Sequence, residues 1–208
     1  MSTREGDWSD VTSKTLDNYN ERAGPFRAAT WDHDVSQNLD ALINAIEGKG
    51  PFSILDFGCG PGRDLLALKA RGHVPVGLDG SLRLAEMARE TGAGEVWVQD
   101  FLALDLPASH FDGIFANATL QHVPAAALPR VLGELRVSLK PRGVLFASIP
   151  RGDDTEGWSN DRYSTYHRPE SWQRYCAAAG FTEVLSYFRP TGLPREQQPW
   201  FASVWRRA

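Results

Sequence analysis

Residues Ile54–Asp64 read ILDFGCGPGRD, and a second apolar run, PVGLD, ends at Asp79. The apolar residues over 52–57 predict a buried strand, and an amphipathic helix over 63–71 connects it to the second strand. Between strand and helix the chain turns through three glycines at alternate positions, Gly58, Gly60 and Gly62. Glycine lets a backbone approach a ligand closely, and an acid at the tip of the next strand can accept hydrogen bonds from ribose hydroxyls. These features predict a site for an adenosine-containing cofactor.

The glycine spacing and one carboxylate distinguish between adenosine cofactors. Dinucleotide sites, as in nicotinamide oxidoreductases, use G-x-G-x-x-G against a pyrophosphate, whereas the spacing here is G-x-G-x-G. Asp56, inside the strand before the loop, would repel a pyrophosphate but attract an ammonium or sulfonium group. With Asp79, and with Gln99-Asp100-Phe101 after a third strand, the pattern resembles the first motifs of class I S-adenosylmethionine-dependent methyltransferases. A tight structural turn in another α/β protein is the plainer alternative.

Composition restricts the possible partners. The 208 residues fit one domain, 1–208, and the net charge of −4 with scattered Lys and Arg argues against a nucleic-acid or anionic-membrane partner. The two cysteines, Cys59 and Cys176, suggest neither a disulfide framework nor a zinc site, and we expect no metal. No apolar run approaches the roughly 18 residues of a membrane span, and the polar N-terminus has no signal-peptide core. We therefore expect a cytoplasmic protein that acts on small molecules.

Strands and helices alternate along the chain, which predicts an α/β fold with a mostly parallel sheet. We expect a helical cap over 1–48, with helices over 15–26 and 36–47, and a long ordered substrate loop over 151–168. The remaining predicted strands are 95–98, 111–116, 144–149, 181–188 and 202–206, and the remaining predicted helices are 81–90, 125–139 and 169–179. In such sheets ligands bind beyond the carboxyl ends of the strands. The resemblance to class I methyltransferases implies a Rossmann-like, seven-stranded sheet with helices on both faces and its last strand antiparallel.

A closer resemblance covers the chain from about Tyr19 onward, to the methyltransferase domain in the C-terminal part of ovothiol synthases. Its carrying segments are DHDVSQN (Asp32–Asn38), ILDFGCGPGRD, EVWVQDFLALDLP (Glu95–Pro107), FDGIFANATLQHVP (Phe111–Pro124), LKPRGVLF (Leu139–Phe146), PRG…GW…RY…YH (Pro150–His167) and GLPREQQPWFASVWRR (Gly192–Arg207). The last two segments are the most restricted. The family implies methylation of a ring nitrogen of 5-thiohistidine, which gives ovothiol A. Ovothiol synthases also carry an iron-dependent sulfoxide synthase, so we expect a separate or fused enzyme of that kind upstream.

The resemblance assigns roles to the cofactor residues. Asp56 and the three glycines should frame the methionine end, with main-chain N–H groups facing its carboxylate. Asp79 should accept the ribose hydroxyls, Asp100 the adenine amino hydrogen, and the Phe101 N–H should meet a ring nitrogen. Asn117, at the end of the strand over 111–116, should face the junction of cofactor and substrate. The alternatives are a solvated acid for Asp79, a turn or cap for Asp100, and a turn residue for Asn117.

The substrate residues are expected further downstream. His122 is the candidate base or orienting group, against the alternative of a packed histidine. Arg151 suits a carboxylate and Asp34 an ammonium group. We also expect contacts from residues that separate this group from generic methyltransferases, Tyr163, Tyr166, His167 and Gln198. Trp31 and Trp158 are candidates to cover the ring, although packing is the more common role of such residues.

Three other functions remain open at this level. The chain is either an excised domain or a stand-alone methyltransferase, and the stand-alone case leaves room for a related substrate such as the selenium analogue 5-selenohistidine. Another small metabolite could be methylated on oxygen, carbon or sulfur. From a different class, a non-catalytic S-adenosylmethionine-binding module would regulate a partner, although nothing requires such a module to keep the whole cofactor set.

Overall fold

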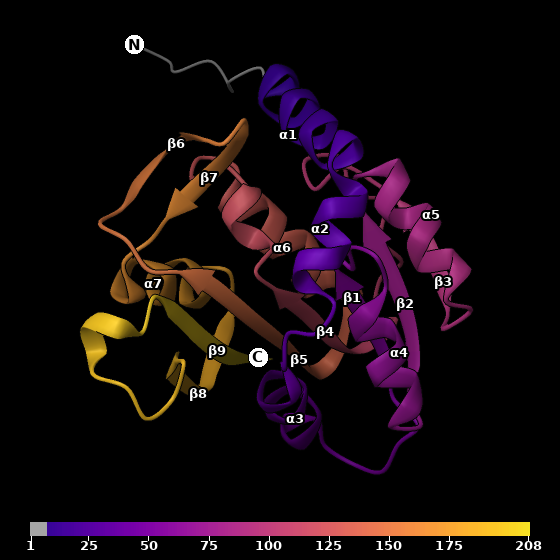
Figure 1. The fold of residues 1–208 in the computed structure, drawn as a ribbon. Coiled ribbons are helices and arrows are strands. Elements are labelled where there is room, and N and C mark those ends of the chain that lie inside the picture. The colour runs from indigo at the N-terminus through magenta and orange to yellow at the C-terminus, as the bar shows by residue number, and fades with distance from the viewer. Residues whose placement is uncertain (1–7) are drawn as a thin grey trace.

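A seven-stranded sheet forms the centre of the protein, as the computed structural model describes for residues 8–208 (Figure 1). In spatial order the strands are β3 (Glu95–Val98), β2 (Val74–Asp79), β1 (Ser53–Phe57), β4 (Phe111–Asn117), β5 (Leu139–Pro150), β9 (Trp200–Arg207) and β8 (Phe181–Arg189). The strands from β3 to β5 pair in parallel, and β9 pairs antiparallel with both of its neighbours. The predicted mostly parallel sheet with an antiparallel last strand is confirmed.

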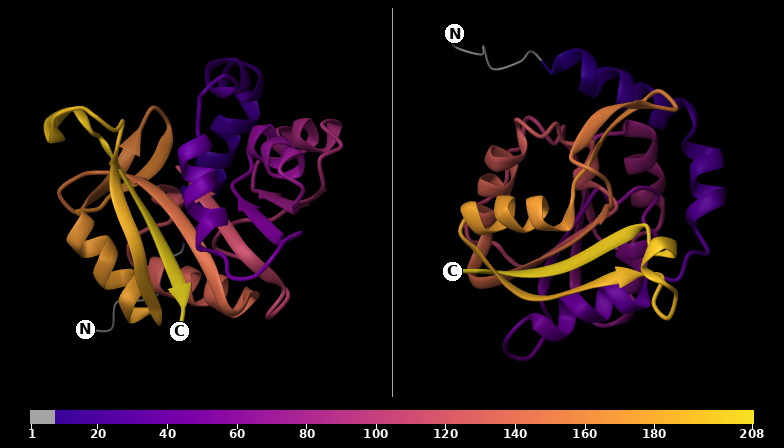
Figure 2. Two further views of the ribbon diagram at one scale, coloured as in Figure 1. Left: turned by 90° about the horizontal axis from the view of Figure 1, so that it is seen from below. Right: turned by 90° about the vertical axis from the view of Figure 1, so that its left-hand side faces the viewer.

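Helices cover both faces of the sheet, so the fold has three layers (Figure 2). One face carries α3 (Ser36–Ala45), α4 (Arg63–Ala70) and α5 (Leu82–Glu90), and the other carries α6 (Leu128–Ser138) and α7 (Pro169–Ala178). The central strands are buried on both sides for this reason. Successive residues of β1 point to opposite faces, and the last four, from Ile54 to Phe57, are all buried.

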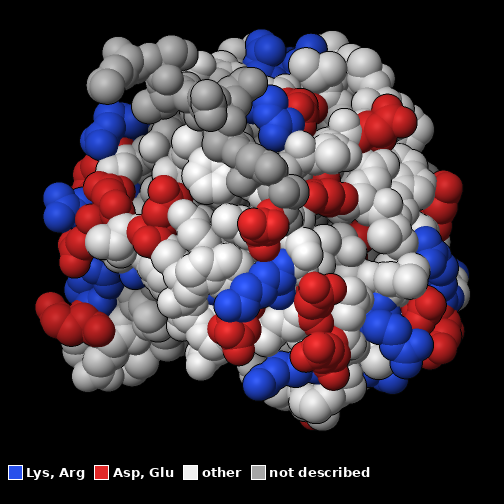
Figure 3. Space-filling view, turned by 90° about the horizontal axis from the view of Figure 1, so that it is seen from above, with Lys and Arg blue, Asp and Glu red and all other residues white. Residues whose placement is uncertain are grey.

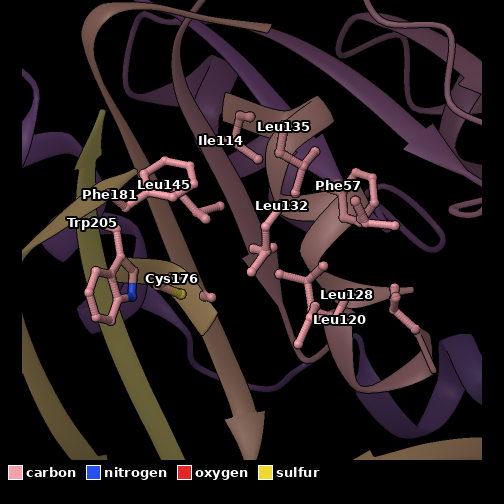
Figure 4. Close-up of a cluster of buried hydrophobic side chains, with 14 of the residues drawn as sticks. Phe57, Ile114, Leu120, Leu128, Leu132, Leu135, Leu145, Cys176, Phe181 and Trp205 are labelled. Carbon is pink, nitrogen blue, oxygen red and sulfur yellow. The ribbon is translucent and has the colours of Figure 1, made fainter. Parts of the chain in front are cut away.

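The largest core cluster lies between the sheet and the helices α6 and α7 (Figure 4). Phe57 and Leu145 reach it from the sheet, and Leu128, Leu132 and Leu135 reach it from one side of α6. The leucines follow a spacing of three and four residues, which places them on one helix face. Burial of this apolar surface holds β1 and β4 in place, and the residues that follow these strands form the candidate site.

The part of the N-terminal cap before α3 has two helices, where the sequence predicted a single helix over 15–26. They are α1 (Ser9–Glu21) and α2 (Ala23–Thr30), joined at Arg22. Pro25 lies in the first turn of α2, where the missing N–H of a proline costs nothing, so α2 continues beyond the predicted end at residue 26. The first seven residues of the predicted 1–48 cap lie outside the described part of the chain.

The segment 151–168 contains a β-hairpin, so the prediction that it is a loop is wrong. Strands β6 (Thr155–Ser159) and β7 (Arg162–Tyr166) pair antiparallel and form a separate two-stranded sheet. Asn160 and Asp161 join them, with φ values of 50° and 59°. Two successive positive φ values are typical of the tightest hairpin turns, which favour Asn and Asp. That dipeptide was the sequence signal for the hairpin.

Candidate active site

A cavity of about 830 Å³ lies at the carboxyl ends of the parallel strands. The glycine loop and the residues after β2 and β4 form one side of it. Helices α1 and α2, the hairpin β6–β7 and the residues before α3 form the other. Figure 1 shows α1 and the hairpin above this edge of the sheet, and contacts between α1 and β7 join them. The cavity therefore lies where an α/β sheet is expected to bind its ligand.

The glycine loop has the close-packed geometry that its sequence predicts. Gly58 has φ +78°, and a Cβ there would lie 2.4 Å from the Thr119 side chain. Gly62 has φ +91°, and a Cβ there would lie 2.9 Å from Cα of Ala88 in α5. Gly58 and Gly60 line the cavity, but Gly62 does not. Gly58 thus lets the loop pack closely against Thr119, whereas Gly62 lets α5 pack closely against the start of α4.

Asp56 lies beneath the loop rather than on the cavity wall. Its side chain points to the face where its neighbour in β2 is Gly77, and only 2% of the residue is exposed. Burial, reinforced by the nearby Asp64, raises the pKa of Asp56 well above its usual value. Its Oδ2 atom has no hydrogen-bond partner among the described residues. This carboxyl group can influence a cofactor's methionine end through the loop, but it does not form the cavity surface.

Asp79 ends β2 and does line the cavity. Its Oδ2 accepts the Gly60 N–H at 2.9 Å and its Oδ1 accepts the Ser81 N–H at 2.8 Å, which fixes the carboxylate between loop and helix. Burial raises the pKa of Asp79 to about 6, while the two N–H donors lower it. Each carboxylate oxygen has a second lone pair for a further donor. The position suits the predicted contact with two ribose hydroxyls.

Asp100 and Phe101 follow β3 and also line the cavity. Asp100 Oδ1 accepts the Leu102 N–H at 2.8 Å. One carboxylate oxygen therefore caps a turn, as the alternative role predicted. The ring of Phe101 packs against Phe57, with centroids 4.4 Å apart. This packing fixes the loop after β3 against the core. Their contact with an adenine ring stays a prediction.

Asn117 ends β4 and belongs to a chain of three polar side chains. The Tyr187 hydroxyl donates to Asn38 Oδ1 at 2.9 Å, and Asn38 Nδ2 donates to Asn117 Oδ1 at 2.9 Å. Asn38, in the first turns of α3, is only 1% exposed. Because the Asn117 oxygen is bound to Asn38, its Nδ2 donors are directed to the cavity that the residue lines. The sequence predicted Asn117 but not the residues that orient it.

His122 lines the cavity, with both ring nitrogens in hydrogen bonds to protein atoms. Nδ1 lies 2.7 Å from the Tyr163 carbonyl oxygen, which can only accept, so Nδ1 carries the proton. Nε2 is therefore an acceptor, and the Tyr19 hydroxyl donates to it at 2.9 Å. Burial lowers the pKa of His122 to about 4. These contacts favour the alternative role, a packed and neutral histidine, over the predicted role as a base. His122 connects α1 to the hairpin.

Two of the six predicted substrate residues, Asp34 and Tyr166, line the cavity. Tyr163 and His167 do not, because β7 is a strand and alternate residues point to opposite sides. His167 lines a separate pocket with Asp154 and Tyr175. Arg151 and Gln198 lie outside the cavity as well. Arg151 donates from Nη1 to the carbonyls of Arg195 and Gln198, so it anchors that segment outside the cavity.

Neither tryptophan that was a candidate to cover the ring lines the cavity. Arg27 stacks on the ring of Trp31, and Lys14 stacks on the ring of Trp158. A different tryptophan, Trp200 at the start of β9, does line it.

The structure adds cavity residues that sequence reasoning missed. They are Tyr19, Asn38, Ser148, Arg162, Ser164, Arg189 and Trp200. Arg162 and Ser164 share one side of β7 with Tyr166, so recognition of the strand would have identified them by their spacing of two residues. Tyr19, Asn38 and Arg189 reach the cavity from segments far apart in the sequence, and no local pattern marks them.

A model of a methyltransferase domain matches residues 13–195. The chain belongs to the methyltransferase family. Trans-aconitate 2-methyltransferase from Azoarcus sp. is 38% identical over 106 residues, which are 49% of this chain and 40% of that protein. Malonyl-[acyl-carrier protein] O-methyltransferase from Erwinia pyrifoliae is 36% identical over 152 residues, 70% of this chain and 57% of that protein. The methyltransferase thus spans about half the length of the curated relatives it matches.

Solved structures share the fold of this methyltransferase. The 1,6-didemethyltoxoflavin-N1-methyltransferase of Burkholderia thailandensis superposes with a TM-score of 0.78 at 20% identity, covering 100% of this chain and 93% of that one. A methyltransferase from Leishmania major gives 0.78 at 20% identity, covering 94% and 82%. At such low identity these likenesses show the fold, which is that of class I S-adenosylmethionine-dependent methyltransferases.

The cavity fits the family's cofactor, S-adenosylmethionine, in two respects. Gly58 and Gly60 line the cavity, so at these two positions the loop presents main chain without a side chain. The buried carboxyl group of Asp79 lies on the wall one strand away, and its hydrogen bond to the Gly60 N–H holds it against the loop.

In residues 8–208 no three His, Cys, Asp or Glu side chains gather as a metal-binding group. None of the helices within the same range combines the length and apolar character that a bilayer crossing requires. On the face shown in Figure 3, basic and acidic side chains are interspersed.

Proposed function

We propose that this methyltransferase transfers the methyl group of S-adenosylmethionine to a ring nitrogen of 5-thiohistidine, giving ovothiol A. The observation that carries the proposal is the origin of the cavity's substrate half. Arg162 and Tyr166 come from the segment RY…YH, and Trp200 comes from GLPREQQPWFASVWRR. These two segments carry the specific resemblance to ovothiol synthases. They enclose the half of the cavity that the cofactor half leaves open.

The chemistry demands positioning more than acid or base catalysis. The cofactor supplies a methyl group that is already electrophilic because it is bound to a sulfonium. An imidazole has an unperturbed pKa near 6.5, so at neutral pH much of the substrate presents a free nitrogen lone pair. That lone pair forms the N–C bond as the C–S bond breaks, and the proton on the other ring nitrogen leaves to water. The protein must align the two atoms at about 3 Å and exclude competing water.

The residues around the cavity divide these tasks. Gly58, Gly60 and Asp79 hold the cofactor at the glycine loop, and Asp100 and Phe101 hold its adenine ring. Asn117, oriented by Asn38, donates from Nδ2 at the junction of the two halves. His122 and Tyr19 connect α1 to the hairpin and so close the cavity over the substrate.

Other methyl acceptors remain within the same reaction class. The selenium analogue 5-selenohistidine has the same shape and the same ring nitrogens. The relatives named for trans-aconitate and for malonyl-[acyl-carrier protein] act on other molecules, and the fold neighbour from Burkholderia is named for a ring nitrogen. We further propose that the enzyme is cytoplasmic and takes its substrate from a sulfoxide synthase, separate or fused.

The test is a competition among acceptors. The protein is incubated with S-adenosylmethionine and, in separate reactions, with 5-thiohistidine, 5-selenohistidine, histidine, trans-aconitate and a malonyl thioester. Mass spectrometry follows a gain of one methyl group. We expect 5-thiohistidine to give the highest kcat/KM. Preference for trans-aconitate or the thioester would overturn the substrate while leaving the reaction class.

A further inference from the structure

Asp34 and Arg189 place opposite charges side by side on the cavity wall. Both residues line the cavity, and Arg189 Nη2 donates to the Asp34 carbonyl oxygen at 3.1 Å. The Asp34 carboxylate accepts the Ser36 N–H through Oδ1 at 2.9 Å, which lowers the pKa of Asp34, with a smaller contribution from Arg189. Within residues 8–208, the Nε and Nη1 groups of Arg189 have no hydrogen-bond partner, and the hydrogen bonds to the Asp34 carboxylate come from Ser36 alone. Both side chains therefore keep charged hydrogen-bonding groups available to a ligand.

The segments that carry this pair also orient Asn117. Tyr187 and Arg189 are two residues apart on β8, so their side chains leave the strand on the same side. Tyr187 bonds Asn38, which lies four residues beyond Asp34 and in turn bonds Asn117. The charged pair is thus fixed, through two connected segments, at one end of the site where methyl transfer takes place.

The other arginines near the substrate half are already engaged. Arg162 donates to the Tyr19 hydroxyl at 3.2 Å and stacks on the Tyr19 ring, which holds it against α1. Arg151 lies outside the cavity and donates to two main-chain carbonyls. Arg189 is therefore the arginine of the cavity wall that lies beside Asp34, and among the described residues only its Nη2 group is in a hydrogen bond.

We infer that Asp34 and Arg189 form a zwitterion site, which binds the α-ammonium and α-carboxylate groups of an amino-acid substrate. The two charged groups of an amino acid are attached to one carbon, so their binding partners must be neighbours. A guanidinium matches a carboxylate through paired N–H donors, and a carboxylate accepts from an ammonium. This assigns to Arg189 the role that the sequence suggested for Arg151. The inference rests on the proposed function, because it assumes that the methyl acceptor is an amino acid.

The test pairs protein variants with substrates that lack one charged group. The variants are Arg189→Met, Arg189→Lys and Asp34→Asn, and the control is Arg83→Met, whose side chain is 62% exposed and pairs with Glu86 on α5. The substrates are 5-thiohistidine, its decarboxylated analogue and its deaminated analogue. Each KM and kcat is measured with S-adenosylmethionine at saturation.

A zwitterion site predicts losses that depend on the substrate. Arg189→Met should raise KM for 5-thiohistidine about 10- to 100-fold, the range for losing charge-assisted hydrogen bonds, and leave KM for the decarboxylated analogue nearly unchanged. Asp34→Asn should show the same selectivity toward the deaminated analogue. Arg189→Lys should raise KM less than Arg189→Met does, since lysine keeps the positive charge but lacks the paired N–H donors of the guanidinium. Equal losses on all three substrates, as a purely structural role predicts, would overturn the inference.

A binding measurement separates this inference from the proposed function. If the wild-type protein methylates none of the histidine derivatives, the protein loaded with S-adenosylhomocysteine is titrated calorimetrically with histidine, histamine and imidazolepropionate. Preference for histidine that disappears in Arg189→Met would support the zwitterion site without the proposed acceptor. Equal binding of the three compounds, or of none, would contradict it.

Discussion

The two halves of the cavity differ in what supplies their ligand contacts. The cofactor half is built from main-chain groups of one loop and from residues that follow neighbouring strands, so its contacts lie within about 60 residues of sequence from Gly58 to Asn117. The substrate half joins side chains far apart in the chain. Tyr19 meets His122 across 103 residues, and Asn38 meets Tyr187 across 149. A local pattern therefore reveals the cofactor, whereas the substrate site depends on how distant segments pack.

The largest effect should come from the cofactor half. Asp79→Asn removes the buried charge that we expect the ribose hydroxyls to meet and disturbs the acceptor for the Gly60 N–H. Loss of charge-assisted hydrogen bonds of this kind should weaken S-adenosylmethionine binding about 100-fold. Calorimetry measures the change. Asp40→Asn, at a side chain that is 58% exposed on α3, is the matched control. Unchanged affinity in Asp79→Asn would remove Asp79 from the cofactor site.

The pH dependence of cofactor binding gives the next effect. Because burial raises the pKa of Asp79 to about 6, its carboxyl group is protonated below that pH in the free protein. Cofactor hydroxyls need the ionised form, so the affinity should be constant above about pH 7 and fall toward tenfold per pH unit below pH 6. Calorimetry from pH 5 to pH 8 checks the profile, which should become shallower in Asp79→Asn. An affinity that rises on acidification would contradict the assignment.

The sequence predicted more of the cofactor half than of the substrate half. The motif ILDFGCGPGRD with Asp79 predicted the α/β fold, the cofactor and the methyltransferase class, since glycine positions and strand ends follow from local chemistry. Tyr163 and His167 were placed on a loop, and only the strand geometry of β7 shows that they point away from the cavity. Arg151 was chosen for its charge, but it lies outside the cavity, where its Nη1 group holds two main-chain carbonyls, and no sequence pattern reveals these contacts.

The connection between the halves is tested at Asn38. Asn38→Leu leaves Asn117 without the partner that orients its amide, so we expect kcat to fall about tenfold, as misplacement of a positioning group predicts. Cofactor affinity should change little. Asn38→Asp is the matched variant, because an acceptor-only side chain keeps the Tyr187 bond but turns the Asn117 amide around. If neither variant alters kcat, Asn117 does not depend on this network.

The smallest effect on turnover should come from His122. Both of its nitrogens are bound within the protein and its pKa is lowered to about 4, so His122→Gln should reduce kcat less than about fivefold, far below the 10²–10⁴ of a general base. Thermal stability should fall instead, since α1 loses a contact to the hairpin. Tyr19→Phe, which removes the donor to Nε2, should lower the melting temperature similarly. A 100-fold loss of kcat at unchanged melting temperature would restore the catalytic role.

The position of the transferred methyl group tests the central claim most directly, because it reports on both halves of the cavity at once. The protein is incubated with S-adenosylmethionine carrying a deuterated methyl group and with 5-thiohistidine, and the product is analysed by mass spectrometry and NMR. We predict one labelled methyl group on an imidazole nitrogen. A labelled thioether or methyl ester, or recovery of unlabelled 5-thiohistidine with cofactor bound, would contradict ring-nitrogen methylation by this protein.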